Sequence, residues 1–164
     1  MQFAVVGTGN ILLGDEGAGV VAARRLQQVV CSEEVEVVDA GVAFMDVAPL
    51  LNGFDRVIVV DAVRGGGEPG KVYRFTLEDI ANNETAAISL HDIGIFQAFS
   101  MEKLQGRGPR EVVFYGIEPG DIRLSLELSG QVLEKIDTVV HMIIDELKTS
   151  GAALCQKANY KEAN

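Results

Sequence analysis

The chain has 164 residues, 48% of them hydrophobic and 23% charged, so it can form one globular core and lies outside the disordered and collagen-like compositions. Its formal net charge of -10 repels phosphate backbones and argues against nucleic acid as a partner. The first apolar run ends at Gly7, too early for a signal peptide or a membrane span. We therefore expect a soluble domain that binds neither nucleic acid nor membrane.

The first half of the sequence alternates strand-like and helix-like segments. An apolar run ends in the turn that begins at Gly7, and a change to helical spacing follows it. The β-branched run before Asp61 is typical of a strand that is covered on both faces. The predicted segments of this half are strands over 3–6, 35–38 and 56–60 and helices over 15–29 and 45–51.

The second half continues the alternation and ends in a long amphipathic helix. Its predicted segments are an edge strand over 71–75, a loop over 82–89, a helix entered at His91 and ending near Leu104, a strand over 111–117 and a helix over 129–147. Strands separated by helices imply right-handed crossovers and a mostly parallel sheet, which makes the fold class α/β. We expect a single domain over 1–150.

The end of the chain, over 151–164, has small and charged residues without a period, and we expect it to be frayed. The two cysteines, Cys31 and Cys155, are far apart and form no Cys-x-x-Cys pair. This spacing suggests neither a disulfide framework nor a thiolate metal site. We therefore expect a reducing, cytoplasmic compartment.

Polar residues follow the predicted parallel strands, at the edge of the sheet where α/β proteins bind ligands. Glu16 follows the first strand, Asp39 the second and Asp61 the third, and His91 stands at a helix entrance. Two carboxylates and an imidazole that converge from separate loops are suitable ligands for nickel, zinc or a similar cation. The same groups could instead serve as a general base and its orienting partners.

Each of these residues also has a purely structural interpretation. Glu16 could be a solvated acid in a first helical turn, where the helix dipole favours negative charge. Asp39 and Asp61 could be turn formers that bond the following backbone amides. A lone histidine such as His91 is weak evidence for a site. Only convergence of these side chains in space favours the chemical interpretation.

The glycine turn from Gly7 to Gly14 also suggests a small nucleotide-binding domain, with Asp39 as the acid that binds ribose. The spacing of the glycines is wrong for that fingerprint, and apolar residues replace the helix start that should face pyrophosphate. No Gly-Lys-Ser/Thr, Gly-x-Ser-x-Gly or His-Glu-x-x-His sequence is present. The two acids and the histidine remain the best chemical candidates.

The first turn, over 7–17 (GTGNILLGDEG), resembles the opening motif of the hydrogenase maturation proteases. The resemblance spans about residues 3–147. It continues through four short segments: Val-Asp-Ala-Gly at 38–41, Val-Val-Asp-Ala at 59–62, Ser-Leu-His-Asp at 89–92 and Tyr-Gly-Ile-Glu-Pro at 115–119.

The resemblance implies a three-layer sandwich, in which a twisted, mostly parallel five-stranded sheet with one antiparallel edge strand has helices on both faces. It also implies an endopeptidase that removes a C-terminal extension from the precursor of the nickel-iron hydrogenase large subunit after nickel insertion. By position, Glu16, Asp61 and His91 resemble the three metal-binding residues, and Asp39 resembles an acid held near the cleft. The resemblance makes all four candidate catalytic residues.

Three expectations about partners follow from the same resemblance. The nickel is expected to be carried by the substrate, so that the three ligands test for a loaded precursor before cleavage. A monomer is expected, and a maturation chaperone is a further candidate partner. A non-enzymatic nickel escort or docking module that uses the same ligands is the main alternative.

Overall fold

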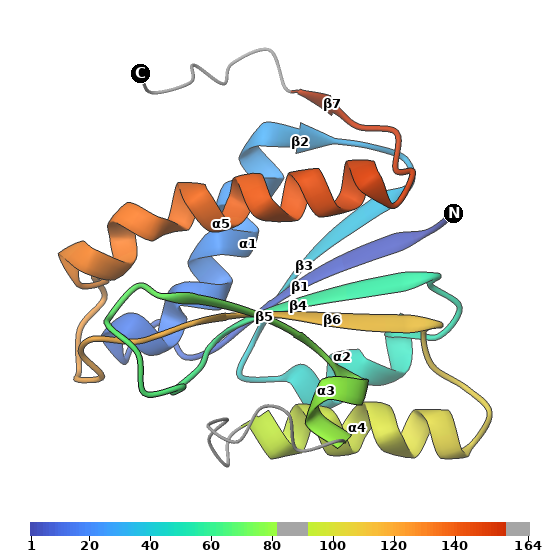
Figure 1. Cartoon of the computed structure of the whole chain (residues 1–164), viewed down its shortest axis with the longest axis horizontal. Coiled ribbons are helices and arrows are strands. Elements are labelled where there is room, and N and C mark those ends of the chain that lie inside the picture. Colours follow the sequence, from blue (N-terminus) through green and yellow to red (C-terminus); the bar gives the residue numbers. More distant parts are fainter. Residues whose placement is uncertain (82–91, 157–164) are drawn as a thin grey trace.

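A computed structural model of the chain describes residues 1–81 and 92–156 (Figure 1). The strands are β1 Phe3–Thr8, β2 Val30–Cys31, β3 Val35–Gly41, β4 Arg56–Ala62, β5 Val72–Thr76, β6 Glu111–Ile117 and β7 Cys155–Gln156. The α-helices are α1 Ala18–Val29, α2 Phe44–Val47, α3 Leu77–Ala81, α4 Asp92–Leu104 and α5 Gly130–Thr149. Two short 3-10 helices are η1 Gly14–Gly17 and η2 Ala48–Leu51.

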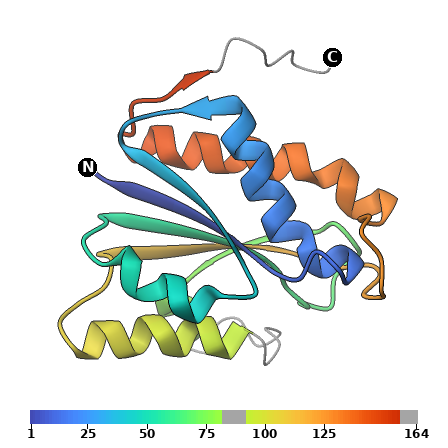
Figure 2. The ribbon, with the colours of Figure 1, turned by 180° about the vertical axis from the view of Figure 1, so that it is seen from behind.

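The central sheet has five strands in the order β3-β1-β4-β6-β5. β1 pairs in parallel with β3 and β4, and β4 pairs in parallel with β6. β5 pairs antiparallel with β6 at the edge. Helices α1 and α5 cover one face of the sheet, and α2 and α4 cover the other (Figures 1 and 2). The predicted α/β sandwich and its antiparallel edge strand are confirmed.

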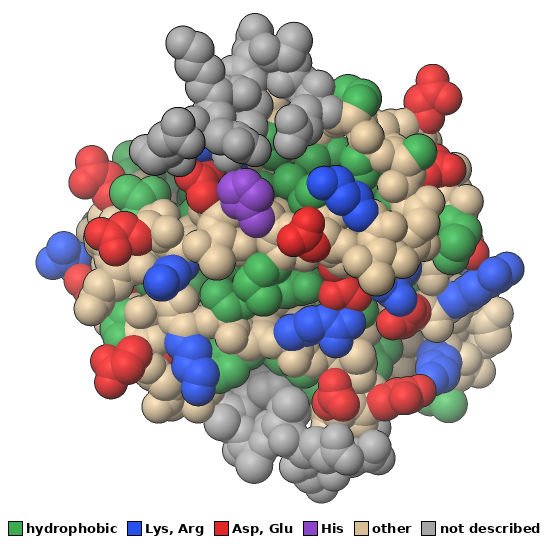
Figure 3. Space-filling model, turned by 45° about the horizontal axis from the view of Figure 1, so that its top comes forward, with side chains coloured by type: hydrophobic (Ala, Val, Ile, Leu, Met, Phe, Trp, Pro, Cys, Tyr) green, Lys and Arg blue, Asp and Glu red, His purple; other side chains and the backbone are tan. Residues whose placement is uncertain are grey.

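Each face of the sheet has its own apolar core, because successive strand residues point to opposite faces. Phe3 and Val5 of β1 pack in the core under α1 and α5, whereas Ala4 and Val6 pack in the core under α2 and α4. Helix α5 buries one stripe of side chains at helical spacing: Val132, Ile136, Val139, Val140, Ile143 and Leu147. The side of the molecule that α5 covers carries intermixed acidic and basic side chains (Figure 3).

Two glycines bring the start of α1 close to the sheet. A Cβ atom on Gly19 would lie 2.1 Å from the carbonyl oxygen of Val60 and 2.5 Å from that of Thr8. A Cβ atom on Gly7 would lie 2.4 Å from the carbonyl oxygen of Gly19. Only glycine permits backbones to approach so closely. The helix therefore starts directly over the ends of β1 and β4, and the η1 turn before it lies at that edge of the sheet.

The structure corrects the expectation about the cysteines, because Cys31 and Cys155 form a disulfide with a Cα–Cα distance of 5.3 Å. β7 pairs antiparallel with β2 at this point. Ala152 is also buried, so residues 151–156 differ from the predicted frayed end. The pairing joins residues 124 positions apart, which local spacing cannot reveal. The reducing compartment was inferred from cysteine spacing alone, and that basis is lost.

Other differences concern the ends of elements. The helix predicted from residue 15 begins as η1, and α1 starts at Ala18. The short helix α3 was not predicted, and the loop predicted over 82–89 lies outside the described residues. Within residues 1–81 and 92–156, no helix has the length and apolar character needed to cross a membrane.

Candidate functional site

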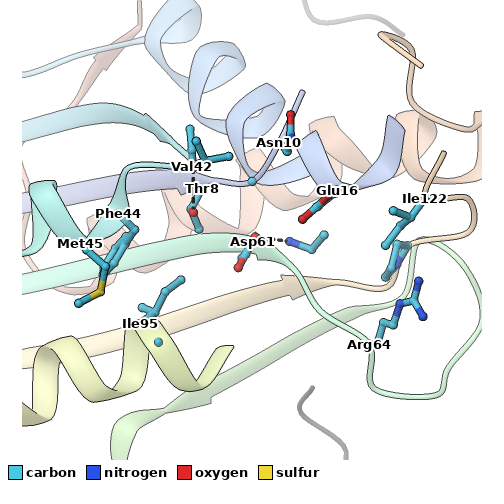
Figure 4. Close-up of a pocket in the computed structure, with 15 residues that line it drawn as sticks. Thr8, Asn10, Glu16, Val42, Phe44, Met45, Asp61, Arg64, Ile95 and Ile122 are labelled. Carbon is cyan, nitrogen blue, oxygen red and sulfur yellow. Dashed lines mark hydrogen bonds between the residues drawn. The ribbon is translucent and has the colours of Figure 1, made fainter. Parts of the chain in front are cut away.

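A pocket of about 350 Å³ opens at the carboxyl ends of β1, β3 and β4 (Figure 4). Four other segments join the first turn in forming its walls. They are the turn after β3 together with the start of α2, the turn after β4, the first residues of α4 and the loop after β6. The lining residues are Thr8, Gly9, Asn10, Glu16, Gly41, Val42, Phe44, Met45, Asp61, Ala62, Arg64, Gly94, Ile95, Pro119 and Ile122.

Glu16 and Asp61, two of the residues predicted from the sequence, both line this pocket. Glu16 comes from η1 and Asp61 from β4, and both residues are half-buried. The Asp61 Oδ1 atom accepts a hydrogen bond of 2.8 Å from the backbone N–H of Ala62. Figure 4 shows both acids in the pocket. Two half-buried carboxylates in one cavity are suitable oxygen ligands for a divalent cation.

His91 lies outside the described residues, so its position relative to the two acids stays a prediction. The helix that follows it, α4, places Gly94 and Ile95 in the pocket wall. Among the residues that the structure describes, no three His, Cys, Asp or Glu side chains are grouped to hold a metal ion. The proposed three-ligand set therefore needs His91.

Asp39 does not line the pocket, although it precedes residues that do. Its Oδ2 atom forms an ion pair of 2.7 Å with Nε of Arg24. Its Oδ1 atom accepts a hydrogen bond of 3.1 Å from the backbone N–H of Gly41. These contacts fix the turn that carries Gly41 and Val42 into the pocket wall. They support the structural interpretation of Asp39, that of a residue which stabilises a turn.

Asp15 has a role that the sequence did not reveal, because its carboxylate is fully buried and holds the loop after β6. Oδ2 accepts hydrogen bonds of 2.8 Å from the backbone N–H groups of Gly120 and Asp121. Oδ1 accepts one of 2.7 Å from the N–H of Ser129, whose hydroxyl donates to Oδ2 at 2.8 Å. Burial raises the Asp15 pKa, but these hydrogen bonds outweigh it and leave the pKa below its ordinary value.

Glu118 fixes the loop after β4 in a similar way. Its buried Oε2 atom accepts hydrogen bonds from the backbone N–H of Gly65 at 2.8 Å, from that of Gly67 at 3.2 Å and from the Tyr73 hydroxyl at 2.7 Å. Burial raises the Glu118 pKa, but the hydrogen bonds from Tyr73 and the glycine amides lower it by more than burial raises it. The Glu118 pKa therefore lies below its ordinary value. The carboxylate thus anchors the loop that begins beside Arg64.

Gly9 explains why the first turn is rich in glycine. Its φ angle is 126°, and a Cβ atom there would lie 1.9 Å from the carbonyl oxygen of Glu16. The turn folds back onto the backbone that carries Glu16, so this glycine is needed to position the acid. Gly9 itself lines the pocket beside this acid.

Comparisons with known proteins identify the family of the chain. The family model described as hydrogenase maturation protease matches residues 20–146. The Hydrogenase 2 maturation protease of Escherichia coli is 29% identical over 153 residues, which cover 92% of this chain and 93% of that protein. The hydrogenase expression/formation protein HupD of Bradyrhizobium diazoefficiens is 31% identical over 152 residues, which cover 88% of this chain and 79% of that protein.

A solved structure shares both the fold and the length of the chain. The hydrogenase maturating endopeptidase HybD from Escherichia coli aligns with a TM-score of 0.87 and 26% identity, over 98% of this chain and 100% of that chain. The sheet, the pocket and these similarities define a peptidase. The chain belongs to the hydrogenase maturation protease family.

Proposed function

We propose that the protein is an endopeptidase that removes the C-terminal extension of a nickel-iron hydrogenase large-subunit precursor after nickel insertion. The observation that carries the proposal is the presence of Glu16 and Asp61 in one pocket of a hydrogenase maturation protease fold. His91 completes the proposed ligand set. The three side chains bind nickel that the precursor already holds through its own cysteine thiolates, which places the bond to be cleaved beside the metal.

The rim of the pocket supports a polypeptide substrate rather than a small molecule. Val42, 78% exposed, and Met45 form an apolar rim on the side of the turn after β3. On the side of the loop after β6, Ile122 lines the pocket, and Leu124 and Leu126 farther along this loop are 85% and 77% exposed. Exposed aliphatic side chains beside a cavity are typical of surfaces that contact other proteins.

Cleavage of the peptide adds water across the C–N bond, so a proton must leave the water and reach the departing amine. A metal held beside the bond would position the carbonyl and polarise it, which makes attack by water easier. Glu16 and Asp61 are half-buried and reach the pocket, so either oxygen donor could bind the ion. Asp39 is engaged by Arg24 and Gly41, and its catalytic role stays a prediction.

The test is cleavage of purified precursor, with and without nickel, by the unchanged protein and by Asp61→Asn and His91→Ala. Both variants are expected to fold and to lose processing of the loaded precursor, because each loses one ligand. Asp145→Asn is the matched control, since Asp145 is exposed on α5 and outside the pocket. Normal processing by both variants would refute the ligand assignment.

Two further results would change the proposal. Undiminished cleavage of nickel-free precursor would show that the metal is not the trigger. Binding of the loaded precursor without any cleavage would favour the alternative, a non-enzymatic nickel escort or docking module. The cytoplasmic location, the monomeric state and the chaperone partner stay predictions.

A further inference from the structure

Arg64 is the one cationic residue among the described residues that line the pocket. Its side chain is exposed, and it forms no hydrogen bond or ion pair with any of the side chains described in 1–80 and 94–155. In the view of Figure 4, its side chain lies toward the end of the pocket where Ile122 is, away from Asp61. Other arginines of the described chain do pair with its carboxylates: Arg24, Arg25, Arg56, Arg74, Arg110 and Arg123. Among the described side chains, Arg64 therefore differs from these arginines in having no carboxylate partner at the pocket.

The backbone on both sides of Arg64 is fixed. The N–H of Val63 donates a hydrogen bond of 2.9 Å to the carbonyl oxygen of Ile117, and the N–H of Gly65 donates one of 2.8 Å to the buried carboxylate of Glu118. These anchors hold the residue at one place in the wall while its side chain stays in solvent. A guanidinium group presented in this way is suited to a planar, two-point hydrogen bond with a carboxylate.

We propose that Arg64 determines specificity by binding a carboxylate of the substrate chain close to the cleaved bond. The inference rests on the proposed function, since the pocket must receive a polypeptide. Glu16 and Asp61 make their side of the pocket acidic, so a substrate carboxylate is attracted to the Arg64 side and repelled from the other. This difference orients the chain along the pocket. The carboxylate belongs either to an Asp or Glu side chain or to the end of the extension.

The experiment pairs substitutions in the enzyme with changes in the precursor. Arg64→Glu and Arg64→Gln are compared with Arg107→Glu, which makes the same charge change at an exposed arginine outside the pocket. Unchanged unfolding midpoints would show that the variants fold. In the nickel-loaded precursor, each acidic residue near the cleaved bond is replaced in turn by Lys, and in a separate sample the C terminus is amidated.

Arg64→Glu is expected to lower kcat/KM on the unchanged precursor by about tenfold or more, with a smaller effect on kcat, because attraction becomes repulsion. The unchanged enzyme should cleave one altered precursor more slowly than the unchanged precursor. On that altered precursor, the unchanged enzyme and Arg64→Gln should have the same kcat/KM. A Lys substitution with this effect identifies a side-chain carboxylate, and amidation identifies the terminal one. Arg107→Glu should behave as the unchanged enzyme.

Two results would overturn the assignment of Arg64. One is a kcat/KM of Arg64→Glu within about twofold of the unchanged enzyme, the range of a solvent-exposed charge without a partner. The other is a loss of kcat/KM in Arg64→Gln that is the same on the unchanged precursor and on every altered precursor. Failure of the unchanged enzyme to cleave any precursor would instead refute the proposed function, and Arg64 would then have no such role.

Discussion

Replacement of Asp15 by Ala should destabilise the fold strongly although the side chain carries out no chemistry. The substitution leaves the backbone N–H groups of Gly120, Asp121 and Ser129 without their acceptor. A buried donor that loses its partner costs about 1–3 kcal/mol. Gly120 is exposed and Asp121 and Ser129 are half-buried, so water replaces part of the bonding and the total loss is about 2–3 kcal/mol, the lower end for three donors. That loss is a large part of the 5–15 kcal/mol that stabilises a typical domain.

Urea unfolding at neutral pH measures this loss, and hydrogen exchange locates it. The amides of Gly120, Asp121 and Ser129 should exchange faster in Asp15→Ala than in the unchanged protein. Ser129→Ala is the control, because it removes one hydroxyl bond and leaves all three amides bonded, for a loss of about 1 kcal/mol. If the free energy of unfolding of Asp15→Ala were within about 1 kcal/mol of that of the unchanged protein, the buried carboxylate would not support the loop.

Two further predictions concern pH and the disulfide. The folded-state pKa values of Asp15 and Glu118 lie below their ordinary values of 3.8 and 4.5. Both carboxylates therefore stabilise the fold at a pH above these ordinary values. This stabilisation is lost as the pH falls through the folded-state pKa. Thermal unfolding midpoints should therefore drop in acid, and less so for Asp15→Asn; parallel curves would contradict the assignment. Cys31→Ser should lower the unfolding free energy by about 2–5 kcal/mol and leave precursor cleavage unchanged, because the bond closes a long loop near the start of β1. Loss of cleavage in a variant that stays folded would show that the disulfide affects the pocket.

The sequence was sufficient for the parts of the fold that depend on local patterns. The apolar run over 111–117 became β6 with the same bounds, and the alternating residues over 71–75 became the antiparallel edge strand β5 within one residue. Burial on both faces explains why such runs are continuous rather than alternating in the central strands. The glycine turn was also visible, since Gly9 has to adopt a positive φ angle.

The candidate site was only partly predictable, because Asp39 and Asp61 look alike in the sequence. Each is an acid at the end of a parallel strand, followed by Ala. The difference is that Arg24 of α1 forms an ion pair with the Asp39 carboxylate, whereas Asp61 lines the pocket. One local signal was available for Asp39, since an acid two residues before Gly41 suits a turn that bonds the glycine amide. The contact with Arg24 depends on the packing of α1 and could not be read from spacing.

The turn over 118–121 connects both sides of the pocket, which gives it more influence than its position in the wall suggests. The amides of Gly120 and Asp121 bind the carboxylate of Asp15, the residue next to Glu16. The side chain of Glu118 binds the amides of the loop that follows Asp61. The pocket edge therefore has two acids that face the cavity and two buried acids that hold the backbone around them. A substitution that distorts this turn should displace Glu16 and Asp61 together, because the first turn and the loop after β4 are both bonded to it.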